Sequence, residues 1–412
     1  MIVREEGGAW TTSFSVFVIA VIQCGPGLLS SGCSPGDSNA SVVEESPLGW
    51  GGPVVARETR RWSAASMDSA SLWVVAATAS FVGVPDMVDN PLYEGGRGQR
   101  LVGEGAFFPD GRIAVLYDLL PDSILLHLFD PESGDEALIP APPTNDGRYW
   151  HNARMVIHGG RVILMPAFRV GRRNGEDIWY ADHEGRFTLP SSRVAARGKL
   201  VGALPDGSLV VGSPYWTTDA AGTARLSSLM SVRPRGPGEE LSEPDKPEVI
   251  FTGALRMDDG DGDIPAAGAH DYTMTCAVAG DTIWVVPGER PELVAVQRSG
   301  DVALKIEWEA GDRTVPPGAR EWDGAERFPA ASDLKIGTDG LIYVQRMTVR
   351  GDQPVQGPEW LVFNPAGELV ARLDVPGGLQ VLGFGDGVML ATGSNREMRR
   401  FEVRVYELAE SE

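Results

Sequence analysis

The sequence predicts an all-β fold built from a repeated unit of four short antiparallel strands, and three observations lead to this prediction. The 412 residues include 51 glycines and 30 prolines, a content that suits many short strands joined by tight turns. Residues 359–376 alternate apolar and polar side chains on both sides of the turn Asn364-Pro365-Ala366-Gly367, the pattern of a β-hairpin. The third observation is that this hairpin has relatives along the chain.

The repeated unit contains a glycine turn that leads into an apolar strand, as in TDGLIYV at 338–344. A two-residue hairpin turn of type I′ needs positive φ, which glycine adopts without steric cost. One strand precedes each such turn and a hairpin usually follows, which gives four strands, A to D, in units of about 40 to 50 residues, the period of β-propeller blades. The turn glycines are Gly111, Gly160, Gly207, Gly280, Gly340 and Gly387.

The last unit indicates how the repeats close. It ends with the strand 401–408 and has no fourth strand, whereas 71–77 is a strand without a unit of its own. Pairing 72–77 with 401–408 closes a ring and leaves neither edge exposed. We therefore predict a six-bladed β-propeller of four-stranded antiparallel blades over residues 67–408, closed by its N-terminal strand.

The N-terminal region has the features of an export signal. The apolar run 16–22 is shorter than the roughly 20 residues of a membrane-spanning helix and suits a signal peptide. The segment 28–33, LLSSGC, resembles a bacterial lipobox, in which Cys33 becomes lipidated. It departs from that pattern at Ser30, where leucine is expected, and two glutamates follow Arg4. Simple secretion and an uncleaved anchor remain alternatives.

These features divide the chain into a signal peptide of lipoprotein type (1–33), a flexible tether (34–66), the propeller (67–408) and a short tail (409–412). We expect an exported protein in the periplasm or at the outer membrane, held there by its lipid. Of the three cysteines, two fall in the signal region, and Cys276 alone remains. A disulfide framework and a cysteine-based zinc site are therefore excluded.

The composition bears on the partners. The formal net charge is −21 and the pI is near 4.7, so the chain repels nucleic acid and anionic headgroups. We predict no nucleic-acid partner, membrane contact only through the lipid, and a monomer that binds an unknown ligand, glycan or protein. Acidity also keeps an exported protein soluble.

Several stretches carry a resemblance to a known group. They are GEGAFFPDGRIAVLYD (103–118), GDTIWVV (280–286), the segment 359–390 and VRVYEL (403–408). In this order they resemble a large bacterial group of exported six-bladed β-propeller proteins, related to NHL-repeat and YncE-like propellers. The resemblance implies the fold and an exported location, and it implies no activity.

Long connections favour one face of the predicted propeller. They are the B–C loops 167–177, 213–224 and 346–359 and the D–A loops 256–272 and 309–332. Long loops over a rigid scaffold usually carry recognition, so we predict the functional face at this end. The alternative is that these loops are long because their length does no harm.

Three groups on these loops are candidate site residues. An acidic group has carboxylates at alternate positions, as at the start of a calcium loop, so Ca²⁺ is a possible cofactor. It is not an EF-hand, because Ile264 replaces the required glycine, and a solvated acidic loop is the alternative. A basic group suits an anion, unless it pairs with the abundant carboxylates. The third group combines aromatic, imidazole and guanidinium side chains suited to a ligand pocket. The acidic group is Asp259, Asp261, Asp263 and His270. The basic group is Arg169, Arg172, Arg173, Arg193 and Arg197. The third group is Tyr149, Trp150, His151, Arg154 and Trp216.

The sequence carries no nucleophile elbow, no His-Glu-x-x-His and no phosphate loop. We therefore predict a non-catalytic binding module that acts through its long loops. The rival prediction is a calcium-dependent hydrolase, lactonase or lyase with a metal in the central channel. Its ligands would come from His151, Asn152, Asp263, His270 and Asp271.

Overall fold

The structure is a computed structural model, and its sheets all lie in one compact unit, Ser46–Glu412. No helix in the described part of the chain is long and apolar enough to cross a membrane. The described residues are 56–82, 101–119, 123–140, 153–165, 176–182, 186–194, 199–212, 217–218, 224–233, 248–257, 275–286, 290–314, 328–350, 353–395 and 400–411.

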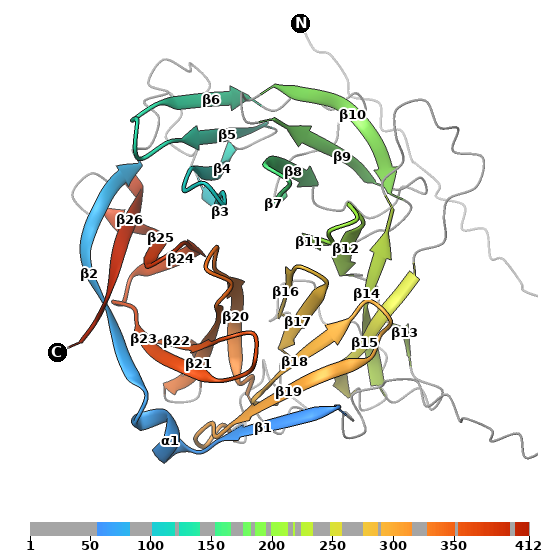
Figure 1. The fold of residues 1–412 in the computed structure, drawn as a ribbon, viewed down its shortest axis with the longest axis vertical. Helices are drawn as coiled ribbons and strands as arrows, with labels where there is room; N and C mark the ends of the chain where they lie inside the picture. Colours follow the sequence, from blue (N-terminus) through green and yellow to red (C-terminus); the bar gives the residue numbers. More distant parts are fainter. Residues whose placement is uncertain are drawn as a thin grey trace, which may run out of the picture. The chain divides into compact units, whose positions relative to one another are not determined.

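The predicted all-β fold is confirmed, and the strands form mainly antiparallel sheets that follow one another along the chain (Figure 1). The first sheet contains β3 (Leu101–Phe107), β4 (Ile113–Leu119), β5 (Ser123–Phe129) and β6 (Glu136–Pro140). The second contains β7 (Arg154–His158), β8 (Arg161–Met165), β9 (Glu176–Ala181) and β10 (Phe187–Val194). The third contains β11 (Lys199–Ala203), β12 (Leu209–Gly212), β13 (Thr217–Thr218), β14 (Ala224–Val232) and β15 (Glu248–Met257).

Two further sheets include the N-terminal strands. One contains β16 (Thr275–Ala279), β17 (Thr282–Val286), β18 (Glu292–Gln297), β19 (Val302–Trp308) and β1 (Glu58–Trp62), and the short helix α1 (Ala64–Asp68) follows β1. The other has eight strands: β20 (Ala331–Ile336), β21 (Ile342–Arg350), β22 (Gln353–Phe363), β23 (Leu369–Asp374), β2 (Ser71–Val82), β26 (Arg400–Glu410), β25 (Val388–Asn395) and β24 (Leu379–Phe384).

The eight-stranded sheet contains the predicted closure. Strand β2 pairs antiparallel with β26, with Val75 opposite Leu408 and Val82 opposite Val403, so the predicted pairing of the N-terminal strand with the last strand is confirmed. Its other edge pairs in parallel with β23, which the sequence analysis did not predict. Strand β2 thereby joins two antiparallel groups of strands. The predicted tail is also corrected, because β26 continues to Glu410.

Strand β1 corrects the predicted extent of the tether, since it lies within 34–66 and pairs in parallel with β19. Ion pairs hold it there: Arg57 contacts Asp301 at 2.8 Å and Arg61 contacts Glu307 at 2.6 Å. The indole nitrogen of Trp62 donates a hydrogen bond to the carbonyl of Gly367 at 3.3 Å. The segment ETRRW lacks the alternation of a half-buried strand, which explains why it reads as a tether in the sequence.

The predicted B–C loop 346–359 is also corrected. Strands β21 and β22 extend as a hairpin in which Met347 lies opposite Gln356 and Arg350 opposite Gln353. Backbone pairing therefore replaces most of the predicted loop. In this register Thr348 also lies opposite Val355.

The predicted positive φ of the turn glycines is confirmed. All of Gly111, Gly160, Gly207, Gly280, Gly340 and Gly387 have φ between 56° and 89°. The predicted two-residue geometry holds for Gly159-Gly160, where His158 pairs directly with Arg161.

The Asp-Gly turns at Gly111, Gly207 and Gly340 are one residue longer than predicted, whereas Asp386-Gly387 keeps the predicted two-residue form, with the N–H of Gly385 donating to the carbonyl of Val388 at 2.8 Å. Around Gly111, the backbone N–H of Gly111 donates to the carbonyl of Phe108 at 3.0 Å, and the N–H of Phe108 donates to the carbonyl of Arg112 at 2.7 Å. This is a type I turn followed by one residue of positive φ. Asp110 Oδ1 accepts the N–H of Arg112 at 3.2 Å and thereby stabilises the longer turn.

The first strands of four sheets, β3, β7, β11 and β16, contact one another in that order, β16 contacts β20 and β20 contacts β24 of the eight-stranded sheet, and β24 in turn contacts β3. Figure 1 shows these strands nearest to the common centre. The buried clusters lie between neighbouring sheets; one of them joins Val115 on β4 to Leu390 on β25. Radial antiparallel sheets arranged in a closed circuit are the architecture of a β-propeller.

Glycine permits the close approach of two of these inner strands. A Cβ atom on Gly202 of β11 would lie 2.5 Å from both Cβ and Cγ2 of Val278 on β16. We expect Gly202→Ala to lower the free energy of unfolding by about 1–3 kcal/mol, because the strands must separate to admit the methyl group. Urea unfolding measures this.

Gly311→Ala is the matched control for Gly202→Ala. A Cβ atom at Gly311 meets nothing within 4 Å, so the loss of backbone freedom in the unfolded chain leaves this variant unchanged or slightly more stable. Equal unfolding midpoints for the two variants would contradict the close approach of β11 and β16.

Candidate functional site

Most of the predicted site residues lie outside the described residues, so their roles stay predictions. Arg193 is in β10, and Arg154 begins β7. The others are Cys33, Tyr149, Trp150, His151, Arg169, Arg172, Arg173, Arg197, Trp216, Asp259, Asp261, Asp263 and His270, together with Asn152 and Asp271 of the rival prediction.

Arg154 is engaged within the fold. Its Nη1 forms an ion pair with Glu104 Oε1, and Glu104 Oε2 accepts the backbone N–H of Met155 at 2.5 Å. Glu104 lies on β3 and Arg154 on β7, so the pair links two neighbouring sheets. A ligand at Arg154 would therefore compete with an internal carboxylate. Among the described residues, no group of three or more His, Cys, Asp or Glu side chains is placed to hold a metal ion.

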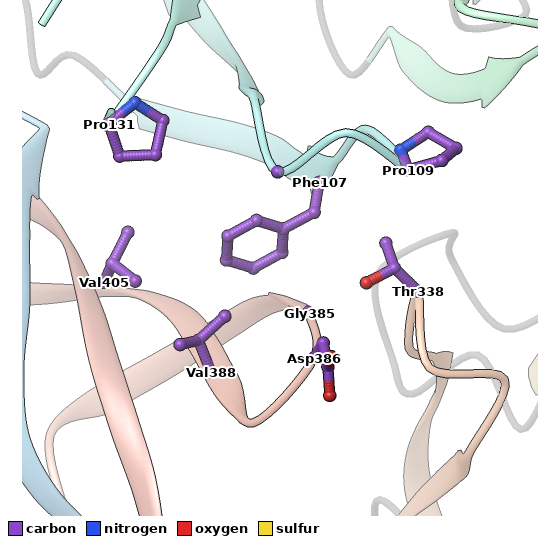
Figure 2. A pocket seen from close by; sticks show the side chains of 9 residues that line it. Phe107, Pro109, Pro131, Thr338, Gly385, Asp386, Val388 and Val405 are labelled. Atoms are coloured by element: carbon purple, nitrogen blue, oxygen red, sulfur yellow. The ribbon is translucent and has the colours of Figure 1, made fainter. Parts of the chain in front are cut away.

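A pocket of about 310 Å³ lies where the turns of three strand pairs meet (Figure 2). Turns β3–β4, β20–β21 and β24–β25 border it, together with the turn after β5 and strand β26. Because these are A–B and C–D turns, the pocket lies opposite the predicted loop-rich face. We call it the turn-face pocket, and its lining residues are Phe107, Pro109, Gly111, Pro131, Thr338, Gly385, Asp386, Val388 and Val405.

The lining is mainly apolar. In Figure 2 the Phe107 ring lies between Pro131, Val405 and Val388 on one side and Pro109 and Thr338 on the other. Phe107 is only 8% exposed and belongs to the core cluster shared by the first sheet and β24–β26. The pocket floor is therefore a continuation of the core.

Backbone hydrogen bonds hold the turns that border the pocket. The N–H of Thr338 donates to the carbonyl of Phe384 at 3.3 Å, which ties the β20–β21 turn to β24. The N–H of Gly385 donates to the carbonyl of Val388 at 2.8 Å. The pocket is thus preformed, which lowers the entropic cost of binding.

The polar side of the pocket is acidic. Asp386 lines it, and Asp339 occupies the neighbouring β20–β21 turn, where Oδ1 accepts the N–H of Leu341 at 2.9 Å and Oδ2 accepts the hydroxyl of Tyr343 at 3.1 Å. Partial burial raises the pKa of Asp339, and the charge of Asp386 raises it further, whereas the two hydrogen bonds lower it. Negative charge is therefore concentrated beside the pocket.

Two described cations, Arg112 and Arg404, are adjacent in the sequence to lining residues, and both are paired; Arg404 contacts Glu402 at 2.5 Å. Arg112 donates to Asp110 Oδ2 from Nε at 3.0 Å and from Nη2 at 2.7 Å. Its guanidinium also lies over the Phe108 ring, 4.9 Å from the centroid. This pairing lowers the pKa of Asp110, and it leaves Asp386 as the charged side chain that lines the pocket.

Sequence reasoning missed this pocket because it used loop length as the signal, and the bordering turns are short. A weaker signal was present. The turn FFPDG at 107–111 places two aromatic residues and a proline where turns are usually polar. Apolar residues at the ends of tight turns indicate a hollow in which these turns pack together.

Strand β5 carries a buried ionisable group outside the pocket. His127 is 1% exposed, and its Nε2 lies 3.1 Å from Glu136 Oε2. Burial lowers the pKa of His127, and Glu136 opposes this effect. Below the ordinary histidine pKa of 6.5, the unfolded chain binds a proton that the folded chain excludes. We therefore expect His127 to reduce stability as the pH falls through 6.5.

His127→Gln tests this expectation, because glutamine keeps a hydrogen-bond donor for Glu136 and does not titrate. Urea unfolding on both sides of pH 6.5 should show a smaller loss of stability on acidification for the variant than for the parent. The control variant is His158→Gln, because the His158 side chain at the end of β7 is partly exposed. Parallel pH profiles for His127→Gln and the parent would contradict the expectation.

No protein-family model matches the sequence, and no curated protein matches it. Among solved structures, the chain is similar to regucalcin from Agrobacterium tumefaciens, described as a calcium-binding protein, with 15% identity over 83% of this chain and 97% of that one and a TM-score of 0.37.

Two other solved structures are similar. An exported protein from Bacteroides fragilis is 10% identical over 86% of this chain and 100% of that one, with a TM-score of 0.45. The β-propeller domain of the Trilobed protease from Pyrococcus furiosus is 13% identical over 76% and 97%, with a TM-score of 0.34.

Proposed function

We propose that this protein is an exported six-bladed β-propeller that acts as a binding module, anchored by a lipid on Cys33. The blade number is supported by the circuit of inner strands from β3 to β24 and back. In this proposal β2 serves as the outermost strand of the last blade, beside β26. The long loops, with the basic and aromatic residues predicted there, supply a further recognition surface.

The observation that carries the binding function is the turn-face pocket. It is preformed and mainly apolar, and it has few polar groups, the usual composition of a small-ligand site. Its volume of about 310 Å³ is at the lower end of the range for such sites, so the ligand is small. The described lining residues form an apolar hollow with one charged side chain, Asp386, and such a lining suits the binding of a ligand.

A fragment screen by thermal shift tests this function, because a ligand that binds only the folded state raises the melting temperature. Thr338 is exposed at the rim of the pocket, so Thr338→Trp should block it without disturbing the core. Thr59→Trp on β1 is the matched control. Fragments that stabilise the parent and Thr59→Trp but not Thr338→Trp support the function, whereas hits that stabilise all three equally overturn it.

The anchor has a separate test. Mass spectrometry of the exported protein should find a lipid-modified Cys33 as its first residue. Cys33→Ser should release the protein from the membrane fraction, and Cys276→Ser should not. The calcium-dependent enzyme is the rival outcome, and a higher melting temperature in calcium than in EDTA would favour it.

A further inference from the structure

We propose that the turn-face pocket binds a small amine, with an apolar body against Phe107, Val388 and Val405 and its positive charge beside Asp386. This inference rests on the proposed function and adds the class of ligand. The apolar part follows from the lining, since five of the nine lining residues are phenylalanine, proline or valine.

The charge of the ligand follows from what surrounds the pocket. Asp386 is the ionisable residue of the lining, and Asp339 lies close enough for their charges to interact. In the described turns around the pocket, the guanidinium of Arg112 is held by Asp110. A carboxylate or phosphate ligand would therefore meet repulsion, whereas an ammonium group would gain a charge-assisted hydrogen bond.

The aromatic ring adds to this preference. A cation over the face of the Phe107 ring would be attracted by the ring quadrupole. Thr338 carries a hydroxyl at the same rim, and Figure 2 shows Thr338 and Asp386 on the side of the pocket away from Pro131 and Val405. The polar and apolar parts of the pocket are thus separated, and this arrangement is complementary to a ligand that has a charged group at one end and an apolar body at the other.

Three probes with the same phenyl body test the proposal by isothermal titration: phenethylamine, phenethyl alcohol and phenylacetate. We expect phenethylamine to bind about tenfold, or about 1.4 kcal/mol, more tightly than phenethyl alcohol, because its ammonium group pairs with the charge of Asp386 whereas the alcohol is neutral. Phenylacetate should bind most weakly of the three.

Asp386→Asn should weaken phenethylamine binding about tenfold and leave phenethyl alcohol unchanged. Asp281→Asn is the matched control, because Asp281 occupies the corresponding turn between β16 and β17, away from the pocket lining. It should leave all three affinities unchanged.

The two proposals fail differently. If phenethyl alcohol or phenylacetate binds as tightly as the amine and Thr338→Trp abolishes that binding, the amine class is overturned and the binding function stands. If phenethylamine affinity is the same in the parent and Asp386→Asn, the role of Asp386 is overturned. If none of the three probes binds the parent, the amine class is overturned, and the fragment screen decides the function separately.

Discussion

A chain that begins at residue 83 should fail to fold cooperatively, whereas a chain that begins at residue 56 should melt like the full protein. The shorter chain lacks β1, α1 and β2, and β2 pairs with β26 on one edge and with β23 on the other. It therefore exposes two strand edges at once. It also uncovers apolar residues that β2 shields, among them Leu373 and Tyr406, which belong with Trp73 and Val75 to one core cluster.

The size of this effect follows from the burial that is lost. Each large apolar side chain that becomes exposed costs about 1.5–3 kcal/mol, and several do so here, so the sum approaches the roughly 5–15 kcal/mol that stabilise a typical domain. Calorimetry should show no cooperative transition for the chain from residue 83. A transition at the temperature of the chain from residue 56 would show that β2 is dispensable and would contradict the closure.

Trp360→Ala should lower the free energy of unfolding by about 3–5 kcal/mol. Trp360 on β22 is 1% exposed, and it meets the Phe384 ring of β24 edge-on, with centroids 5.3 Å apart. Phe384 in turn stacks on Tyr343 at 3.7 Å. Removing the indole leaves a cavity between the β20–β23 strands and the β24–β26 strands and removes one partner of this aromatic group.

Leu138→Ala is the control for Trp360→Ala, because Leu138 on β6 is 41% exposed. Its change in unfolding free energy should stay within about 0.5 kcal/mol. Urea unfolding of both variants measures the difference. A loss below about 1 kcal/mol for Trp360→Ala would mean that the two groups of strands do not share a packed core.

Parts of the fold that depend on local chemistry could be predicted from the sequence. The positive φ of Gly207 and Gly340 follows from the turn each must form. The pairing of β2 with β26 follows from counting strands, since an unpaired strand at one end of the chain matched a missing strand at the other. Both predictions need only the steric rules of a turn and the need to satisfy strand edges.

Parts that depend on long-range packing could not be predicted. Strand β1 is charged, and its position follows from carboxylates more than 240 residues away, such as Glu307. The parallel pairing of β2 with β23 also adds a second partner that no repeat requires. The turn-face pocket arises where turns from distant parts of the chain meet, so no single segment reveals it, and sequence reasoning favoured the opposite face.

The parallel pairing of β1 with β19 has a mechanical consequence for a protein held by its N-terminus. Tension from the membrane would enter the fold at Arg57 and run along β1, whose partners extend from Leu304 to Trp308. A force along this strand acts in shear on all of its backbone hydrogen bonds to β19 at once. A force across the strand would instead break these hydrogen bonds one after another. The ion pairs of Arg57 and Arg61 flank the same interface, so in the lipid-anchored protein proposed above this short strand would bear load between the N-terminus and the sheets.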